Sequence, residues 1–439
     1  SSNEFYEDVV LKNPFAVFRA AYPPHPRRFG GLEILKYIGP GMIVTVGFID
    51  PGNWASNVAA GSQFGYTLLW MVTLSTLMLI VLQHNVAHLG IASGLCLSEA
   101  IHGHMRPIAG NVLLGSAVLA AISTAVAELL GASIGLHMLF PAVPLQVFVV
   151  LVLALILWML YTNSYRRLER YIIGLVSLIG LSFIFELSLV HLDWHAALVG
   201  WVVPRFPPGS IPVIMSVLGA VVMPHNLYLH SEIIQSRQWN LEDESVITRQ
   251  LRYEFLDTLL SMLIGWAINS AMILMAASAF YAKQTPVDDL QQAEAMLRPL
   301  MGGSAAIVFA VALVLAGISS SVTAGMAGGS IFAGFYGEPY DIKDSHSRLG
   351  VGITLIGAAA VILGISLFTK DLFMGLIISQ ILLSIQLPWT IFAQVKLTSS
   401  TKVMGTHANP RGTKVTLWAI AAVVTALNVM LLISIVRGN

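Results

Sequence analysis

The stretches that decide the fold are GFIDPGN at residues 47–53 and GAVVMPHN at residues 219–226. Each places a proline in the middle of an apolar run. Proline removes a backbone hydrogen bond, and its ring clashes with the preceding helical turn. Aligning the two prolines superposes Asp50 on Met223, and an asparagine follows two residues after each proline. The sequence therefore predicts two helices that are interrupted at matching points.

The composition around these motifs is that of a membrane protein. The chain has 439 residues, of which 56% are hydrophobic and 10% charged, whereas a soluble domain carries about 25% charged residues. Lys and Arg balance Asp and Glu at 23 each, so we expect no nucleic acid as a partner. A single cysteine excludes a disulfide framework and a thiolate cluster. We expect the lipid bilayer as solvent and no cleavable signal peptide.

Apolar runs of about 20 residues, the length that crosses a bilayer, predict eleven membrane-spanning helices. They lie near residues 38–60, 66–91, 108–139, 144–162, 170–191, 211–236, 254–281, 302–335, 349–368, 372–395 and 415–436. The polar, basic residues 1–37 form a separate segment before this single domain of residues 38–436.

The distribution of basic residues predicts the orientation of these helices. With the N-terminus in the cytoplasm, 18 of the 23 Lys and Arg residues lie on the cytoplasmic side. The five outside are Arg205, Lys283, Arg298, Lys370 and Arg437. An odd number of spans then puts the C-terminus outside. We expect a multi-pass protein of the bacterial inner (plasma) membrane.

The two interrupted helices also predict an inverted repeat. Five helices begin with each motif, so the second copy enters the membrane from the opposite side. Residues 38–191 and 211–395 are the two repeats, and residues 415–436 are an added helix. Transporters built this way bind substrate near the bilayer midplane, between the interrupted helices, where freed carbonyls line a cavity or meet an ion. The alternative, two unrelated proline kinks, does not explain the matched flanks and depths.

The residues around the interruptions predict a metal site. Asp50 lies about halfway through its span, where a carboxylate costs roughly 2.5–3.5 kcal/mol to insert. Asn53 adds an amide oxygen, and the opened turn at Ala220 can offer a carbonyl. Oxygen ligands alone would suit Mg²⁺ or Ca²⁺, but the thioether of Met223 favours softer ions, Mn²⁺ or Fe²⁺ with Cd²⁺ and Co²⁺. The alternative is that the methionine only fills space between helices.

The strings DPGN at residues 50–53 and MPHNLYLHS at residues 223–231 resemble the signatures of the Nramp family of metal transporters. The resemblance extends over essentially the whole chain in helix number, motif placement and orientation. The family couples uptake of divalent transition metals to protons, and it has the LeuT-type fold. The resemblance implies an all-α membrane protein with helices 1 and 6 discontinuous.

The resemblance also implies which residues bind the ion. By this comparison the ligands are Asp50, Asn53, the carbonyl of Ala220, and Met223, and Gln380 joins the metal's shell in some states. Gln380 has an alternative role as a glutamine that is hydrogen-bonded between two packed helices.

A proton co-substrate needs titratable groups inside the bilayer. The candidates are Asp50, Glu128, Glu186, His225 and His230. Histidine titrates near neutral pH and suits a relay, and the resemblance supports Glu128 and both histidines as positions near the proton path.

Two departures from the family pattern bear on that path. The family often has an acidic residue three positions before the helix 3 glutamate, where this chain has Ala125. It often has paired arginines where this chain reads Ser347-Arg348. If those groups form the proton exit, this protein couples protons loosely or moves them through its histidines.

Two further clusters have simpler interpretations. His84 and His88 are spaced for one helix face and could bind a metal, but no acidic third ligand is evident, so contacts between helices are favoured. The acidic run Glu242–Glu244 predicts a solvated loop, with attraction of cations as the alternative.

These observations predict a secondary active importer of Mn²⁺ or Fe²⁺ that works by alternating access with proton coupling. The expected partners are metal ions, protons and lipid, with no bound cofactor, and the expected state is a monomer. The alternatives are a Mg²⁺ or uncoupled carrier on the same scaffold, or a membrane metal sensor, for which the loops are short. An enzyme is not expected, because the chain lacks a His-Glu-x-x-His pair or a nucleophile–base arrangement.

Overall fold

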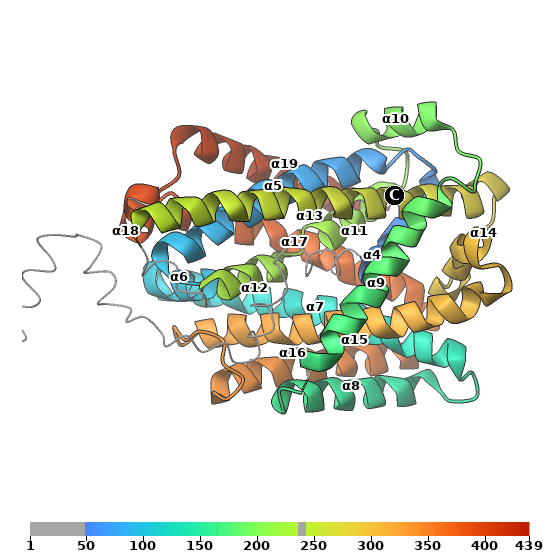
Figure 1. Ribbon diagram of the computed structural model, residues 1–439, viewed down its shortest axis with the longest axis horizontal. Helices are drawn as coiled ribbons and strands as arrows, with labels where there is room; N and C mark the ends of the chain where they lie inside the picture. The colour runs from blue at the N-terminus through green and yellow to red at the C-terminus, as the bar shows by residue number, and fades with distance from the viewer. Residues whose placement is uncertain (1–48, 165, 236–242, 439) are drawn as a thin grey trace, which may run out of the picture.

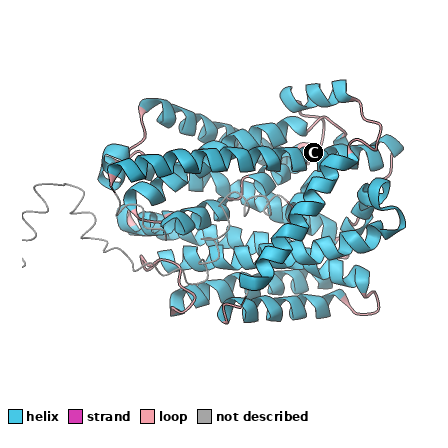
Figure 2. Ribbon diagram, in the orientation of Figure 1, coloured by secondary structure: helices cyan, strands magenta, loops and turns pink. Residues whose placement is uncertain are grey.

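The computed structural model describes residues 49–164, 166–235 and 243–438, and throughout these ranges the regular elements are helices without any strand (Figures 1 and 2). The predicted N-terminal segment, residues 1–37, lies outside the described residues. Residues 38–48, the first half of the first predicted span, also lie outside them, and so does Glu242 of the predicted acidic loop.

The helices that follow the predicted spans have these bounds: α4 (Pro51–Phe64), α5 (Leu69–Ser93), α7 (Pro107–Leu139), α8 (Leu145–Tyr161), α9 (Arg166–Glu186), α11 (Ile211–Val221), α12 (Pro224–Gln235), α13 (Glu244–Ala279), α15 (Ala305–Gly334), α16 (Ser345–Phe368), α17 (Leu372–Thr398) and α19 (Arg411–Arg437). The shorter elements are α6 (Leu97–His104), α10 (Trp194–Val202), α14 (Arg298–Met301), α18 (Thr401–Met404) and the 3₁₀ turns η3 (Tyr281–Lys283), η4 (Leu290–Leu297), η5 (Gly302–Ser304) and η6 (Gly405–His407).

Within the described residues, 8 helices are long and apolar enough to cross a membrane, with α11 and α12 taken together as one. The helix α8 and the apolar part of α9 are shorter. Each predicted span from the second onward therefore corresponds to a helix, or in the sixth span to the pair α11–α12.

The helix bounds differ from the apolar runs where polar residues extend a helix. The helix α13 begins at Glu244 and not near residue 254, because a polar stretch continues the helix beyond its apolar part. The short helices α6 and α10 were not predicted. Hydropathy measures the length that lipid would cover, and it misses helices outside that layer.

Most of the long helices run roughly along the longest axis of the molecule, and α9 crosses them obliquely (Figure 1). The elements α6 and α18 lie at one end of the bundle, and α10 and α14 lie at the other. The helix α4 packs against α11, α13 and α17 in the interior. Close packing elsewhere depends on small residues: a β-carbon added to Gly317 of α15 would lie 2.7 Å from both Ala132 and the carbonyl oxygen of Glu128 on α7. Such contacts hold helices together in lipid, where no hydrophobic force acts between them.

The sixth predicted span is interrupted as the sequence indicates. The helix α11 ends at Val221, Val222 has a ψ of 85° outside the helical range, and α12 begins with Pro224 as its first residue. In the first span the described part also begins at the motif, with Asp50 as the N-cap and Pro51 as the first residue of α4. The interruption of the sixth helix is confirmed.

The contact between α11 and α17 leaves no room for a side chain at Gly219, because an added β-carbon would collide with the backbone carbonyl of Gln380. We expect Gly219→Ala to destabilise the protein by about 1–3 kcal/mol, the usual effect of overpacking. The measurement is the midpoint temperature of the detergent-purified protein, followed by size-exclusion chromatography. Gly375→Ala on α17 is the matched control, because a β-carbon there meets nothing within 4 Å. Equal midpoints for the two variants would show that the two helices do not pack as described.

Candidate functional site

The extended segment before α4 is held by hydrogen bonds from its own helix. The backbone N–H of Asn53 donates to Oδ1 of Asp50 at 2.6 Å, which caps the helix. The indole Nε1 of Trp54 donates to the carbonyl oxygen of Ile49 at 2.8 Å. Asp50 is only 2% exposed. A carboxylate is therefore fixed in the interior, at a point where the backbone is not helical.

Trp54 also fixes this segment against the rest of the bundle. Its ring centroid lies 5.1 Å from that of Phe183 on α9 and 4.6 Å from that of Phe309 on α15. All three side chains are fully buried or nearly so. The beginning of α4 is thus anchored to two other helices through one aromatic cluster.

The interruption between α11 and α12 frees a backbone carbonyl. Pro224 has no N–H, so the carbonyl of Ala220 lacks the donor that the next helical turn would supply. The carbonyl of Met223, the residue directly before Pro224, accepts the N–H of Asn226 at 3.0 Å. The side-chain Nδ2 of Asn226 also donates to Sδ of Met223 at 3.1 Å. Ala220 and Met223 are both buried.

Gln380 of α17 lies between the two interrupted helices. A β-carbon added to Gly52 would lie 2.6 Å from the Gln380 carboxamide, and one added to Gly219 would meet the Gln380 backbone. The hydroxyls of Ser56 on α4 and Ser216 on α11 are 2.6 Å apart and link the same two helices. The first turn of α4 and the last turn of α11 therefore meet at one glutamine.

Glu128 of α7 belongs to the same region. Gly131, one turn further along α7, lies directly against the ring of Pro51. Glu128 is 2% exposed, and its Oε2 has no hydrogen-bond partner among the described residues.

Other buried polar atoms beside the interruption also lack partners within the described part of the chain. They are Nδ1 of His225 and Oδ1 of Asn226. Leaving a buried polar atom without a partner costs about 1–3 kcal/mol. The polar atoms at the start of α12 therefore suit a site that takes up an ion, a proton or water.

The second predicted histidine of α12 lies in a different cluster. Nδ1 of His230 is 3.4 Å from Nε2 of Gln83, and its Nε2 is 3.6 Å from Oε1 of Glu254 on α13. The other oxygen of Glu254 contacts His84 directly. No acidic neighbour of His84 was evident from the sequence, but this contact joins α5 to α13 and is the kind of contact between helices that the sequence favoured. Glu254 is the residue that sequence reasoning missed, and its only signal was an acidic residue at the edge of an apolar run.

The remaining proton candidate and the two positions that depart from the family pattern lie on α9, α16 and α7. Glu186 is the last residue of α9. Arg348 at the start of α16 stacks over the ring of Tyr161, 5.1 Å from its centroid, and accepts a hydrogen bond from the Tyr161 hydroxyl through its backbone carbonyl. Ala125 is fully buried on α7.

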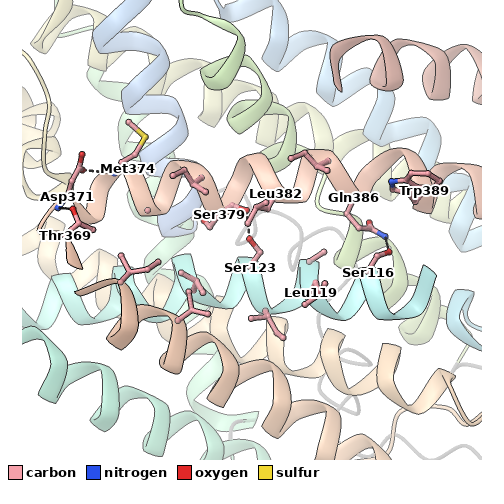
Figure 3. Close-up of a pocket in the computed structure, with 18 residues that line it drawn as sticks. Ser116, Leu119, Ser123, Thr369, Asp371, Met374, Ser379, Leu382, Gln386 and Trp389 are labelled. Atoms are coloured by element: carbon pink, nitrogen blue, oxygen red, sulfur yellow. Dashed lines mark hydrogen bonds between the residues drawn. The ribbon is translucent and has the colours of Figure 1, made fainter. Parts of the chain in front are cut away.

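A groove of about 740 Å³ runs along α7, α16 and α17 (Figure 3). Most of its lining is apolar, and Leu119 and Trp389 are exposed on its rim. Its few polar contacts are internal to the protein, such as the hydroxyl of Ser123 donating to the carbonyl of Ser379 at 2.7 Å. An apolar groove of this kind does not suit an ion, so we do not assign the metal site to it.

Comparison with known proteins shows what this arrangement is similar to. A family described as natural resistance-associated macrophage protein-like matches residues 41–434. The divalent metal cation transporter MntH of Granulibacter bethesdensis is 36% identical over 407 residues, which is 91% of this chain and 88% of that protein. The MntH of a Nostoc species is 35% identical over 416 residues, 92% of each chain.

Solved structures agree on the fold. The manganese transporter of Eremococcus coleocola, in complex with an aromatic bis-isothiourea compound, is 27% identical with a TM-score of 0.71, over 92% of this chain and 86% of that one. Mhp1, a nucleobase-cation-symport-1 family transporter, is 15% identical with a TM-score of 0.58, over 83% and 80%, and shows a shared fold alone. The predicted LeuT-type, all-helical architecture of a multi-pass membrane protein is confirmed.

Proposed function

Because the chain belongs to the natural resistance-associated macrophage protein-like (Nramp) family, we propose that it imports divalent transition-metal ions, Mn²⁺ or Fe²⁺, with Cd²⁺ and Co²⁺ as further cargo. Relatives named divalent metal cation transporters, and a related manganese transporter, support the class of cargo. The observation that carries the proposal is the position of Gln380, in contact with Gly52 beside Asp50 and with Gly219 beside Ala220.

In the proposed site the metal ion is held where the interrupted helices meet. The carboxylate of Asp50 supplies the negative charge, Asn53 an amide oxygen, Ala220 the carbonyl that Pro224 frees, and Met223 the thioether. Sulfur has little value for Mg²⁺ or Ca²⁺ but favours softer ions. Gln380 would complete the shell from α17. The separation of α11 from α12 lets the two halves tilt independently, which supports alternating access.

Proton coupling is the second part of the proposal. Each positive charge entering a negative interior gains about 2.3 kcal/mol per 100 mV, and a co-transported proton adds to this drive. Asp50, Glu128, His225 and His230 are the proposed proton-handling groups. The packing of α7 at Gly131 against Pro51, the neighbour of Asp50, supports a link, because a metal ion at Asp50 would favour the charged form of a nearby Glu128.

Orientation follows from the basic residues. The bundle end that carries α6 and α18 would face the cytoplasm, with the N-terminus inside and the C-terminus outside. The proposed unit is a monomer in the inner membrane, built from residues 38–191, 211–395 and 415–436, and it transports its cargo without catalysing a reaction. An uncoupled carrier is the second candidate, which Ala125 and the contact of Arg348 with Tyr161 favour.

The charge of Asp50 can be tested without disturbing the helix cap. Asp50→Asn keeps an oxygen that accepts the Asn53 N–H but removes the negative charge. We expect Mn²⁺ affinity, measured by calorimetry, to fall at least about 100-fold, the upper range for the loss of a group that supports a metal. Asp288→Asn, in an exposed loop, is the control. Retained affinity in Asp50→Asn would mean that the ion binds elsewhere.

The sulfur of Met223 can be tested by competition. Met223→Ala and the volume-matched Met223→Leu should still transport Mn²⁺ into liposomes, but Ca²⁺ and Mg²⁺ should compete better by about tenfold, which corresponds to about 1.4 kcal/mol. Met374→Leu, on the exposed face of α17, is the control. If Ca²⁺ and Mg²⁺ compete as weakly as in the wild type, sulfur does not determine selectivity.

A further inference from the structure

A row of histidine and glutamate side chains extends away from α12 on the side of α5. It begins at His230, whose Nε2 lies 3.6 Å from Oε1 of Glu254. The other carboxylate oxygen of Glu254 contacts Nδ1 of His84. The hydroxyl of Thr258 donates to Oε1 of Glu254 at 2.6 Å and fixes the carboxylate between the two rings. One carboxylate thus bridges two histidines that belong to different helices.

The row continues from His84 to the end of the bundle. The rings of His84 and His88 are stacked with centroids 6.1 Å apart, and the ring of His407 in η6 lies 6.1 Å beyond His88. Nε2 of His407 is 2.8 Å from Oε1 of Glu244, the first residue of α13. Six titratable groups from three helices and one loop therefore form a continuous series.

The two members at the core end of this series are buried, His407 near its other end is 19% exposed, and its last member, Glu244, is the most exposed. The side chain of Glu254 is 3% exposed and that of His230 is 8% exposed, whereas His84 is 30% and Glu244 is 69% exposed. The row therefore joins the buried core to solvent at the end of the molecule that carries α18 (Figure 1). The helices α5, α12 and α13 that carry the row are also joined by an apolar cluster: Ala87, Ile91, Ile234, Ile247 and Leu251.

The groups of this row suit protons better than metal ions. Among the described residues, no three His, Cys, Asp or Glu side chains are grouped so as to hold a metal ion. The charged or titratable neighbours that act on Glu254 are His230 and His84, and those that act on His88 are His84, His407 and Glu254. Each member thus faces another member of the row. Imidazole and carboxylate groups can each accept a proton on one side and release one on the other.

We propose that His230, Glu254, His84, His88, His407 and Glu244 form a proton relay between the core of the transporter and the cytoplasmic surface. This inference rests on the proposed function, since the relay would carry the proton that accompanies the metal ion. In each step a ring N–H or carboxyl O–H bond breaks and one forms on the next group, and the last proton passes to water. Between rings 6.1 Å apart, a bridging water completes the transfer.

The relay also provides a proton route that does not need the two positions at which this chain departs from the family pattern. The chain has Ala125 on α7 where an acidic residue is common, and Arg348 at α16 contacts Tyr161. A route through α5 and α13 uses neither position. It begins two helical turns beyond Met223 along α12, so its groups do not touch the proposed metal ligands.

The test uses the purified full chain in liposomes, with Mn²⁺ influx and luminal pH recorded together. Glu254→Gln keeps the volume and a hydrogen-bond acceptor for Thr258 but cannot pass on a proton. A positioned acid–base group contributes about 10²–10⁴-fold to proton transfer, so we expect at least about a tenfold fall in proton flux while Mn²⁺ influx is retained. The matched control is Glu338→Gln, whose carboxylate pairs with His346 at 2.8 Å outside the row.

A second variant keeps the relay testable if Glu254→Gln fails to fold. His84→Gln lies on a partly exposed side chain and should give the same selective loss of proton flux. Groups that act in series are non-additive, so Glu254→Gln with His84→Gln should transport no fewer protons than either single variant. Unchanged proton flux in both single variants would overturn the relay, as would parallel losses of proton and metal flux.

The same two measurements on the wild-type protein distinguish a failure of the relay from a failure of the proposed metal transport. Mn²⁺ influx without luminal acidification would overturn the relay and leave metal transport standing. No Mn²⁺ influx at all would contradict the proposed function, and the relay with it.

Discussion

A lipid bilayer does not tolerate backbone groups without hydrogen bonds, and the rest of this structure depends on how the interrupted helices meet that constraint. At the start of α4, the Trp54 indole satisfies the carbonyl of Ile49 and the Asp50 carboxylate satisfies the N–H of Asn53. At the start of α12, Pro224 instead leaves the carbonyl of Ala220 without a helical donor. The two interruptions thus meet the constraint differently: side chains of α4 satisfy the first, and the second leaves a carbonyl without its helical donor.

Glycine brings the two interruptions together. The backbone at Gly52 and at Gly219 lies directly against Gln380, and a β-carbon added at either position would collide with that residue. Side chains of ordinary size would hold α4 and α11 away from α17. The same lack of side chains that weakens a helix therefore allows α4, α11 and α17 to approach closely at one point.

The sequence predicted what is local and missed what depends on helix rotation. Proline chemistry acts within one turn, so the end of α11 at Val221 followed directly from Pro224. Hydropathy located the long helices, but it placed the start of α13 too late because polar helical turns carry no apolar signal. The contact of Glu254 with His84 joins residues far apart in the chain. No single-sequence pattern shows which faces of α5 and α13 meet, so this pair could not be predicted.

The central claim is that one metal ion binds where the interrupted helices meet. The most direct measurement is an anomalous difference map from crystals of the protein soaked in Mn²⁺, collected at the manganese absorption edge. The account predicts one strong peak within coordination distance of the Asp50 carboxylate, the Ala220 carbonyl and the Met223 sulfur. A peak elsewhere, with none between these residues, would contradict it.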